Sequence, residues 1–466
     1  MENNTKNTEA IYDARKLGLP KTLVLGLQHM FAMFGATVLV PAITGLDVAT
    51  TLLFAGLGTL LFHLITGGKV PAFLGSSFAF LGGYAAIAPK LADANGELTI
   101  ANTEMLPYAC FGVACAGLVY LVLALLFKIF GAKKVMRFFP PIVTGPIIIA
   151  IGLIFSGTAI SSCSANWLVA LVAILVVIIC NIWGKGMIKI IPILLGVIAS
   201  YIVSMIVDPA SRAVVAQKVS EAAWIGLPIH WEATAFSVFG EGFNPSLLIN
   251  AIITIVPIAL ATIVEHIGDM CAISSTVGKN YVEDPGLHRT LVGDGLATSV
   301  ASLFGAPANT TYGENTGVLA LSKVYDPKVV RLAAWFAIIL SFCPKFAALI
   351  VAMPGATMGG VSLVLYGMIS AVGVRNVVEN QVDFTKSRNV LIAAMILCLA
   401  IGIKYSPVTG GAITFPVGAV TISLSGLAVA AIVGIAMNAI LPGKDYEFGA
   451  NEQGDTAVNF GARNDG

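Results

Sequence analysis

The chain has 466 residues, of which 57% are hydrophobic and only 11% are charged, whereas an ordinary soluble domain is about 25% charged. This composition excludes a water-soluble globule, and a net charge of +1 gives no indication of nucleic-acid binding. Successive apolar runs reach the roughly 17–25 residues that a helix needs to cross a bilayer. The sequence therefore predicts an all-α polytopic membrane protein, surrounded by membrane lipids.

Residues 1–21 are polar and of mixed charge, which predicts a cytoplasmic tail rather than a cleavable signal peptide. Fourteen apolar segments follow and are interpreted as membrane spans. Seven lie before a polar connection at 208–245 and seven after it: 22–42, 48–66, 71–88, 107–130, 138–158, 166–183 and 187–207, then 246–268, 291–305, 310–322, 328–352, 354–374, 388–403 and 412–441. A second cytoplasmic tail is predicted at 442–466.

The basic residues test this count of spans. With the N-terminus inside, the predicted cytoplasmic tails and loops contain 21 of the 26 Lys and Arg residues. The other five are Lys90, Arg212, Lys218, Lys345 and Lys404. Because basic residues concentrate on the cytoplasmic side of membrane proteins, this distribution predicts a multi-pass protein of the cell (plasma or inner) membrane. Both termini are then cytoplasmic, and 208–245 is extracytoplasmic.

The two halves, 22–207 and 246–441, each contain an odd number of spans, so any structural repeat must be inverted. The third span of each half is weak: FLGSSFAFLGG at 73–83 and NTTYGENTG at 309–317 favour extended backbone over helix. Such backbone is tolerated at membrane depth only where protein or a water-filled cavity satisfies it. Interrupted spans at matching positions indicate a transporter's binding site. We therefore expect extended segments near 75–80 and 309–316 to meet at a midplane cavity for a small planar ligand.

Four acidic residues fall inside the predicted spans: Glu265, Asp269, Asp294 and Glu314. A charge at the bilayer centre costs at least about 2.5–3.5 kcal/mol, so such residues are functional candidates. Glu265 and Asp269 are four residues apart, on one helix face. Their mutual repulsion favours a bound proton, which predicts a proton-coupled carrier.

Three histidines are also candidates. His29 is either a coupling residue or a packed histidine. His266 is interpreted as a solvated residue at the cytoplasmic membrane edge, and His63 as structural. The sequence contains no Walker loop, HExxH motif or Cys/His cluster, so we expect no enzymatic activity, no cofactor and no metal. Without an ATP-hydrolysing module, transport must use an ion gradient.

Five motifs in order, LQHMFAMFGATVLVPAITG, PAFLGSSFAF, IVEHIGDM, EDPGLHRTLVGDGLAT and APANTTYGENTGV, resemble the nucleobase–ascorbate transporter family, or nucleobase:cation symporter-2. The resemblance covers 22–441, and the bacterial uracil permeases are the most similar branch. It implies fourteen spans in two inverted repeats of seven, with short antiparallel strands in the third and tenth spans. A core domain would comprise 22–130 and 246–352, and a gate domain 138–207 and 354–441.

The resemblance also implies roles for individual residues. Glu265 and Glu314 match the glutamates that bind the base, and the backbone amides of Phe78 and Gly313 match those that face a substrate carbonyl. Ala36 lies beside them and Tyr312 lines the same pocket. Uracil fits this set, because its ring N–H groups can donate to carboxylates in strong, charge-assisted hydrogen bonds.

We expect proton coupling to involve Asp269 above all, with Glu265, His29 and Asp294. The uracil-type pattern has histidine where this chain has Asp269, and aspartate there is similar to purine carriers. The first expectation is therefore uracil import by proton symport, through an elevator-like or rocking movement of core against gate. The alternatives are a purine (xanthine, urate or guanine) symporter and an anion transporter or channel of the same fold. Sodium could replace the proton, and the resemblance allows a homodimer through the gate domain.

Overall fold

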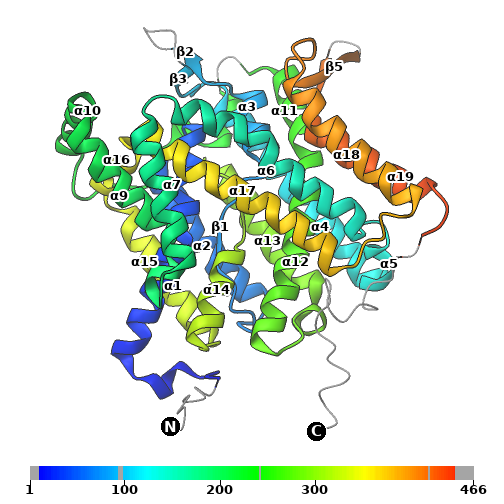
Figure 1. Ribbon diagram of the computed structural model, residues 1–466, viewed down its shortest axis with the longest axis horizontal. Coiled ribbons are helices and arrows are strands. Elements are labelled where there is room, and N and C mark those ends of the chain that lie inside the picture. Colours follow the sequence, from blue (N-terminus) through cyan, green and yellow to red (C-terminus); the bar gives the residue numbers. More distant parts are fainter. Residues whose placement is uncertain (1–9, 93–97, 241–242, 418–419, 445, 447–466) are drawn as a thin grey trace.

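The computed structural model describes residues 10–92, 98–240, 243–417, 420–444 and 446. The chain is built mainly of helices, shown in Figure 1. The longer ones are α1 (Leu19–Thr44), α2 (Val48–Ile65), α4 (Leu106–Phe130), α6 (Pro141–Cys163), α7 (Trp167–Ile182), α9 (Pro192–Val207), α10 (Pro209–Glu221), α11 (Pro245–Ile255), α12 (Ala259–Val277), α13 (Leu287–Leu303), α14 (Gly313–Ser322), α15 (Pro327–Ser341), α17 (Gly355–Glu379), α18 (Ser387–Tyr405) and α19 (Gly426–Ile440). The short ones are η1 (Ala14–Leu17), α3 (Leu81–Ile87), α5 (Ala132–Met136), α8 (Met187–Ile190), η2 (Trp231–Ala233), η3 (Ala235–Phe239), η4 (Val256–Ile258), η5 (Val282–Gly286) and α16 (Pro344–Val351).

Local sequence explains where the functional helices begin and end. Gly45 adopts a left-handed conformation (φ 87°) and its N–H closes the last turn of α1. Asp47 then caps α2 by accepting a hydrogen bond from the Thr50 N–H. Pro257 interrupts the α-helical hydrogen bonds between α11 and α12, where the structure has the 3-10 segment η4. Gly278 ends α12 in the same left-handed way (φ 74°).

Six short strands form three antiparallel pairs. At the centre of the molecule, β1 (Leu74–Ser76) pairs with β4 (Asn309–Thr311), although the two are far apart in the chain. The other pairs are β2 (Leu91–Ala92) with β3 (Leu98–Ile100) and β5 (Ala412–Val417) with β6 (Val420–Ser425). The predicted extended segments of the third and tenth spans thus lie side by side.

Several buried polar groups of these central strands are hydrogen-bonded within the protein. The Leu74 N–H donates to Thr59 Oγ1 (2.9 Å), Thr298 Oγ1 donates to the Asn309 carbonyl (2.9 Å), and Asn309 Nδ2 donates to the Phe54 carbonyl (2.7 Å). Water is absent from a bilayer core, so extended backbone can persist there only with partners of this kind.

Helix contacts fall into two groups. In one, α4 packs on α13, and α2 packs on both α13 and α15. In the other, α6 packs on α17, α7 on α9, and α18 on α19. Small residues allow helices to pack closely. A Cβ on Gly117 of α4 would lie 2.6 Å from the Gly295 carbonyl oxygen of α13, and a Cβ on Gly295 would lie 2.6 Å from the Gly117 carbonyl oxygen.

Within the described residues, seven helical stretches have the length and apolar composition of a membrane span: Leu19–Thr44, Val48–Ile65, Leu106–Phe130, Pro141–Cys163, Pro245–Val277, Gly355–Glu379 and Ser387–Tyr405. Two bent pairs, α9 with α10 (113°) and α15 with α16 (87°), bring the number to nine if each pair is one span. The protein is thus a helical, multi-pass membrane protein. The count is below the predicted fourteen because α7 and α19 are shorter apolar helices, α13 has only 17 residues, and strands interrupt the third and tenth segments.

Three details of the sequence prediction were wrong. Residues 412–417 and 420–425 form β5 and β6 rather than the start of the span expected at 412–441. The central extended segments are shorter than 75–80 and 309–316, because Phe78 lies in a bend and α14 is helical from Gly313 onward. The eighth span does not end at 268, since α12 continues to Val277.

Gly75 provides a test of the central strand pair. A Cβ at this position would lie 2.6 Å from Thr37 Oγ1 and 2.7 Å from two ring carbons of Tyr312. We expect Gly75→Val to lower the melting temperature of the purified protein, because overpacking a buried site costs about 1–3 kcal/mol. Gly367→Val is the matched control, since no atom lies within 4 Å of a Cβ there. Equal melting temperatures for the two variants would contradict the close packing of β1 on Tyr312.

Candidate substrate-binding site

The strand pair leads directly into the predicted substrate residues. β4 ends at Thr311, Tyr312 is the N-cap of α14, and Gly313 is the first residue of that helix. On the other side, Phe78 follows β1 by two residues. The antiparallel register, with Leu74 opposite Thr311 and Ser76 opposite Asn309, places Gly313 and Phe78 at opposite ends of one small sheet.

Tyr312 fixes the geometry of this region. Its hydroxyl donates to the Ser76 carbonyl (2.7 Å) and lies 3.3 Å from Thr37 Oγ1. Ser76 Oγ in turn donates to the Thr37 carbonyl (2.9 Å). Ala36, next to Thr37 on α1, is 1% exposed. These contacts join α1, β1 and β4, and they place Ala36 and Tyr312 in one buried cluster.

Phe78 contacts a residue that the sequence did not indicate. Its ring packs edge-on against Tyr366 of α17, with ring centroids 6.2 Å apart. Tyr366 also packs against Phe155 of α6. Aromatic side chains from the second group of helices therefore reach the ends of the central strands, where they can close one side of a site for a planar ligand.

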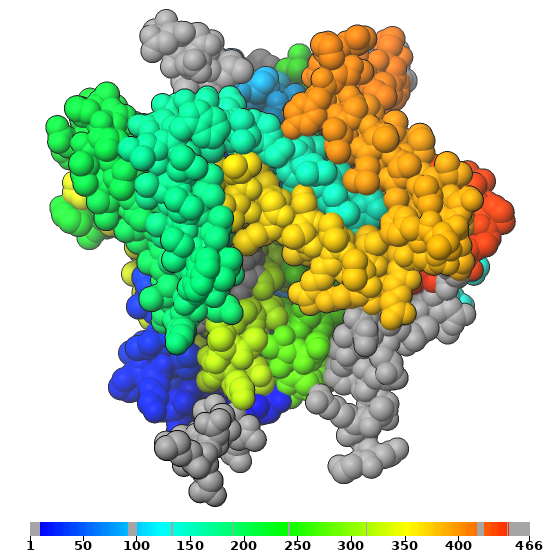
Figure 2. All heavy atoms as spheres, in the orientation of Figure 1, coloured from blue at the N-terminus to red at the C-terminus, as the bar shows by residue number. Residues whose placement is uncertain are grey.

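One face of α12 is accessible although the helix is long enough to lie within the membrane. Glu265, Gly268, Ala272 and Ser275 are exposed and recur every three to four residues. Such a polar, small-residue stripe is unsuited to contact with lipid. Figure 2 shows the molecular surface hollowed between α14 and α17. Glu265 is thus in a position to meet a polar ligand.

Asp269 lies beside the start of α14. The side chain is half-buried, and a Cβ on Gly313 would lie 3.2 Å from its Oδ1 atom. Because α12 is unbroken from Ala259 to Val277, Asp269 is within the helix rather than at its end. Glu314 is the second residue of α14, and its side chain lies outside the described residues.

Asp294 is fully buried on α13 and faces His266 of α12, with 2.9 Å between Oδ2 and Nδ1. His266 is itself only 1% exposed. The expectation that His266 is a solvated residue at the membrane edge was therefore wrong. The eighth span is longer than predicted, and this places His266 well inside the protein.

The two other histidines are packed. His29 is 1% exposed, and Asn315 Nδ2 donates to its carbonyl (3.0 Å) and lies 3.2 Å from its Nδ1. Of the two roles considered for His29, these contacts favour the packed histidine. His63 Nε2 lies 2.8 Å from the Ala72 carbonyl, as expected for a structural residue.

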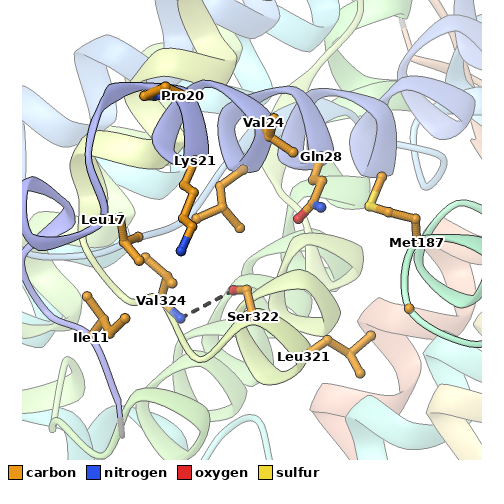
Figure 3. Close-up of a pocket in the computed structure, with 12 residues that line it drawn as sticks. Ile11, Leu17, Pro20, Lys21, Val24, Gln28, Met187, Leu321, Ser322 and Val324 are labelled. Carbon is orange, nitrogen blue, oxygen red and sulfur yellow. Dashed lines mark hydrogen bonds between the residues drawn. The ribbon is translucent and has the colours of Figure 1, made fainter. Parts of the chain in front are cut away.

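A separate pocket of about 580 Å³ lies near the other end of α14. Figure 3 shows Lys21, Val24 and Gln28 of α1 facing Leu321 and Ser322, with Met187 of α8 at one side. None of the predicted substrate residues lines this pocket. Its mostly apolar lining offers few partners for a nucleobase.

Sequence reasoning missed two residues next to the site: Tyr366 and Thr311. Thr311 stands within the TTYGEN motif, and its hydroxyl contacts both His266 and Asp269. A threonine in a weak, polar span segment was a signal for this role. Tyr366 gave no local signal, because its importance comes from a contact between distant helices.

Comparison with known proteins places the chain among permeases. The family model Xan_ur_permease, described as "Permease family", matches residues 20–409. The uracil permease of Bacillus caldolyticus is 39% identical over 431 residues, covering 91% of this chain and 92% of the relative. The uracil permease of Bacillus subtilis (strain 168) is 37% identical over 441 residues, which cover 92% of this chain and 94% of the relative. The putative pyrimidine permease RutG of Escherichia coli (strain K12) is 37% identical over 436 residues, covering 92% and 91%.

Solved structures resemble the fold at low sequence identity. The transmembrane domain of the cyanobacterium bicarbonate transporter BicA has a TM-score of 0.57 at 14% identity, covering 92% of this chain and 99% of that one. The structure of SLC26A9 has a TM-score of 0.62 at 12% identity, covering 92% and 66%. Both likenesses concern the fold alone. The sequence matches, by contrast, extend over nearly the whole chain, and the chain therefore belongs to the Xan_ur_permease (nucleobase:cation symporter-2) family of transporters rather than to an enzyme family.

Proposed function

We propose that this protein imports uracil across the cell membrane by proton symport. The observation that carries the substrate assignment is the 37–39% identity to uracil permeases over more than nine-tenths of the chain. The site geometry supports it, because an exposed glutamate on α12 stands near a strand pair with aromatic neighbours. A flat base with ring N–H donors and two carbonyls is complementary to such a site.

In this site Glu265 and Glu314 accept hydrogen bonds from the ring N–H groups. The backbone amides of Phe78 and Gly313 face the carbonyl oxygens, and Ala36 and Tyr312 complete the pocket. The N-terminus of α14 adds a favourable field for a carbonyl oxygen, because the first N–H groups of a helix lack intrahelical partners. Asp269 is the entry point of the coupled proton.

The chain would be organised as two inverted repeats of seven spans, 22–207 and 246–441. Two pairs of helix contacts support this division. The packing of α4 against α13 corresponds to the packing of α2 against α15, and the packing of α7 against α9 corresponds to the packing of α18 against α19. The first group of contacts corresponds to a core (22–130 and 246–352) and the second to a gate (138–207 and 354–441). Movement of the core against the gate would carry the site across the membrane, and the gate offers the surface for a homodimer.

Orientation in the membrane gives a direct test of this topology. Figure 1 places α10, the β2–β3 pair and β5 at one edge of the molecule and the start of α1 at the opposite edge. In a background without the seven native cysteines, we expect Thr103→Cys to react with a membrane-impermeant maleimide in intact cells. Lys134→Cys should react only after permeabilisation. Both residues are exposed, so the reverse pattern would exclude cytoplasmic termini.

The decisive experiment for function is uptake of labelled uracil into proteoliposomes that contain the purified protein. We expect saturable uptake that excess unlabelled uracil abolishes and that neither xanthine nor sulfate reduces. Competition by xanthine would favour the alternative of a purine symporter, which the aspartate at Asp269 resembles in sequence. Competition by sulfate would favour an anion transporter, although acidic residues at the site disfavour an anion.

A further inference from the structure

A continuous chain of polar atoms leads from Asp269, at the cleft, to the fully buried Asp294. Thr311 Oγ1 donates to Asp269 Oδ2 (3.1 Å) and lies 3.1 Å from His266 Nδ1. The same Nδ1 atom lies 2.9 Å from Asp294 Oδ2. The two contacts of Thr311 are hydrogen bonds, whereas the third is an ion pair at hydrogen-bond length in which the Asp294 carboxylate receives no aligned hydrogen bond from the described residues. The last transfer therefore requires the imidazole to turn its Nδ1 toward Asp294 Oδ2.

We propose that Thr311 and His266 form a proton relay that connects Asp269 to Asp294. The proposal rests on the proposed proton symport and adds to it a second, buried proton-accepting position and the two residues that serve it. Neither Thr311 nor His266 is assigned to substrate binding. They carry the proton between the two acids.

The transfer balances with one proton. His266 begins as a neutral imidazole with its proton on Nε2, an atom that is buried and has no hydrogen-bond partner among the described residues. Its bare Nδ1 accepts the Thr311 hydroxyl proton while Thr311 Oγ1 takes the proton that had arrived on Asp269, and the ring becomes an imidazolium. The imidazolium then passes its Nδ1 proton to Asp294 Oδ2. The imidazole and the hydroxyl end as they began, and one proton has moved from Asp269 to Asp294.

The groups packed around His266 leave access for a proton but for little else. The ionisable groups around His266 are Glu265 and Asp269 on α12, Asp294 on α13 and Tyr120 on α4, whose hydroxyl donates to Thr262 (2.6 Å). The edge of the Phe62 ring of α2 covers the imidazole. Within the described residues, the strand β4 and the helix α6 bring no charged group to it. Neutralising Asp294 removes a buried charge, which is favourable in this apolar setting.

The test uses the whole protein in proteoliposomes and two readouts. Uracil counterflow without a pH gradient measures binding and exchange, and uracil accumulation under an inward proton gradient measures coupling. We expect Thr311→Val to retain counterflow but to lose accumulation, down to the level found without a gradient. Thr311→Ser, which restores the hydroxyl, should restore accumulation. Thr310→Val is the matched control, because it makes the same change one residue earlier in β4, outside the relay.

Each outcome decides a separate point. Gradient-driven accumulation by Thr311→Val at the wild-type level overturns the relay, as does loss of both readouts that serine fails to rescue. If Thr311→Val does not fold, His266→Asn decides instead, because an amide can occupy the Nδ1 position but cannot relay a proton. Absence of uracil counterflow in the wild type would overturn the proposed function itself.

Discussion

Glu265→Gln should weaken equilibrium binding of uracil by roughly 2–4 kcal/mol, because a charge-assisted hydrogen bond is lost and a buried donor of the base is left without a partner. At 1.4 kcal/mol per tenfold change, this is a rise in Kd of roughly thirty- to several-hundred-fold. Titration calorimetry on the purified protein measures it directly. Glutamine has the same shape as glutamate, so the change reports the charge and not the packing.

Glu232→Gln is the matched control, since Glu232 is an exposed residue of η2 outside the proposed site. Glu314→Gln should weaken binding over the same range, by the role that the family resemblance gives to Glu314. Unchanged binding in both purified variants would remove the carboxylates from the mechanism. It would also weaken the uracil assignment, which depends on acceptors for two ring N–H groups.

The general architecture was predictable because the bilayer restricts what a chain can do. Apolar runs of span length predicted membrane helices. Among the described residues, seven helical stretches are each long and apolar enough to cross a membrane without being joined to a second helix. The glycine, serine and threonine content of 73–83 and 309–317 predicted broken spans. The pairing of Leu74 with Thr311 confirms that these two segments meet.

The misplaced strand pair at 412–417 and 420–425 has a different cause. Ile413, Phe415 and Ile422 make this region apolar enough to resemble the start of a span, and hydropathy alone does not separate a strand from a helix. A local signal was present: Gly410 and Gly411 both have positive φ, and β-branched residues follow them. Turn glycines before β-branched residues are typical of strands.

The candidate site was predictable only in part. Glu265, Asp269 and Gly313 came from motif and spacing, and the structure brings Asp269 next to Gly313. The partnership of His266 with Asp294 was not predictable, because it joins two helices across a turn whose geometry no local pattern fixes. Only the packing of α12 on α13 brings these two side chains together.

The second large effect concerns Asp269. We expect Asp269→Asn to abolish the acceleration of uracil uptake by an inward proton gradient while leaving equilibrium binding of uracil nearly intact. Asparagine cannot carry the coupled proton, but its carbonyl oxygen can still accept the hydrogen bond that Thr311 Oγ1 donates to Asp269. The start of α14 therefore keeps its position, and the proposed ligands of the base do not change.

The measurement compares initial uptake rates in proteoliposomes with and without the gradient, and with a protonophore. Asp284→Asn is the matched control, because Asp284 is exposed and pairs with Lys69 at the surface, where such pairs contribute about 0–1 kcal/mol. Uptake by Asp269→Asn that still follows the proton gradient would contradict the entry role of Asp269. Wild-type uptake that ignores the protonophore and follows sodium would replace the proton by sodium, because carboxylates with nearby carbonyl oxygens also suit that ion. The uracil assignment would stand in either case, since it rests on the similarity to uracil permeases and not on the coupling ion.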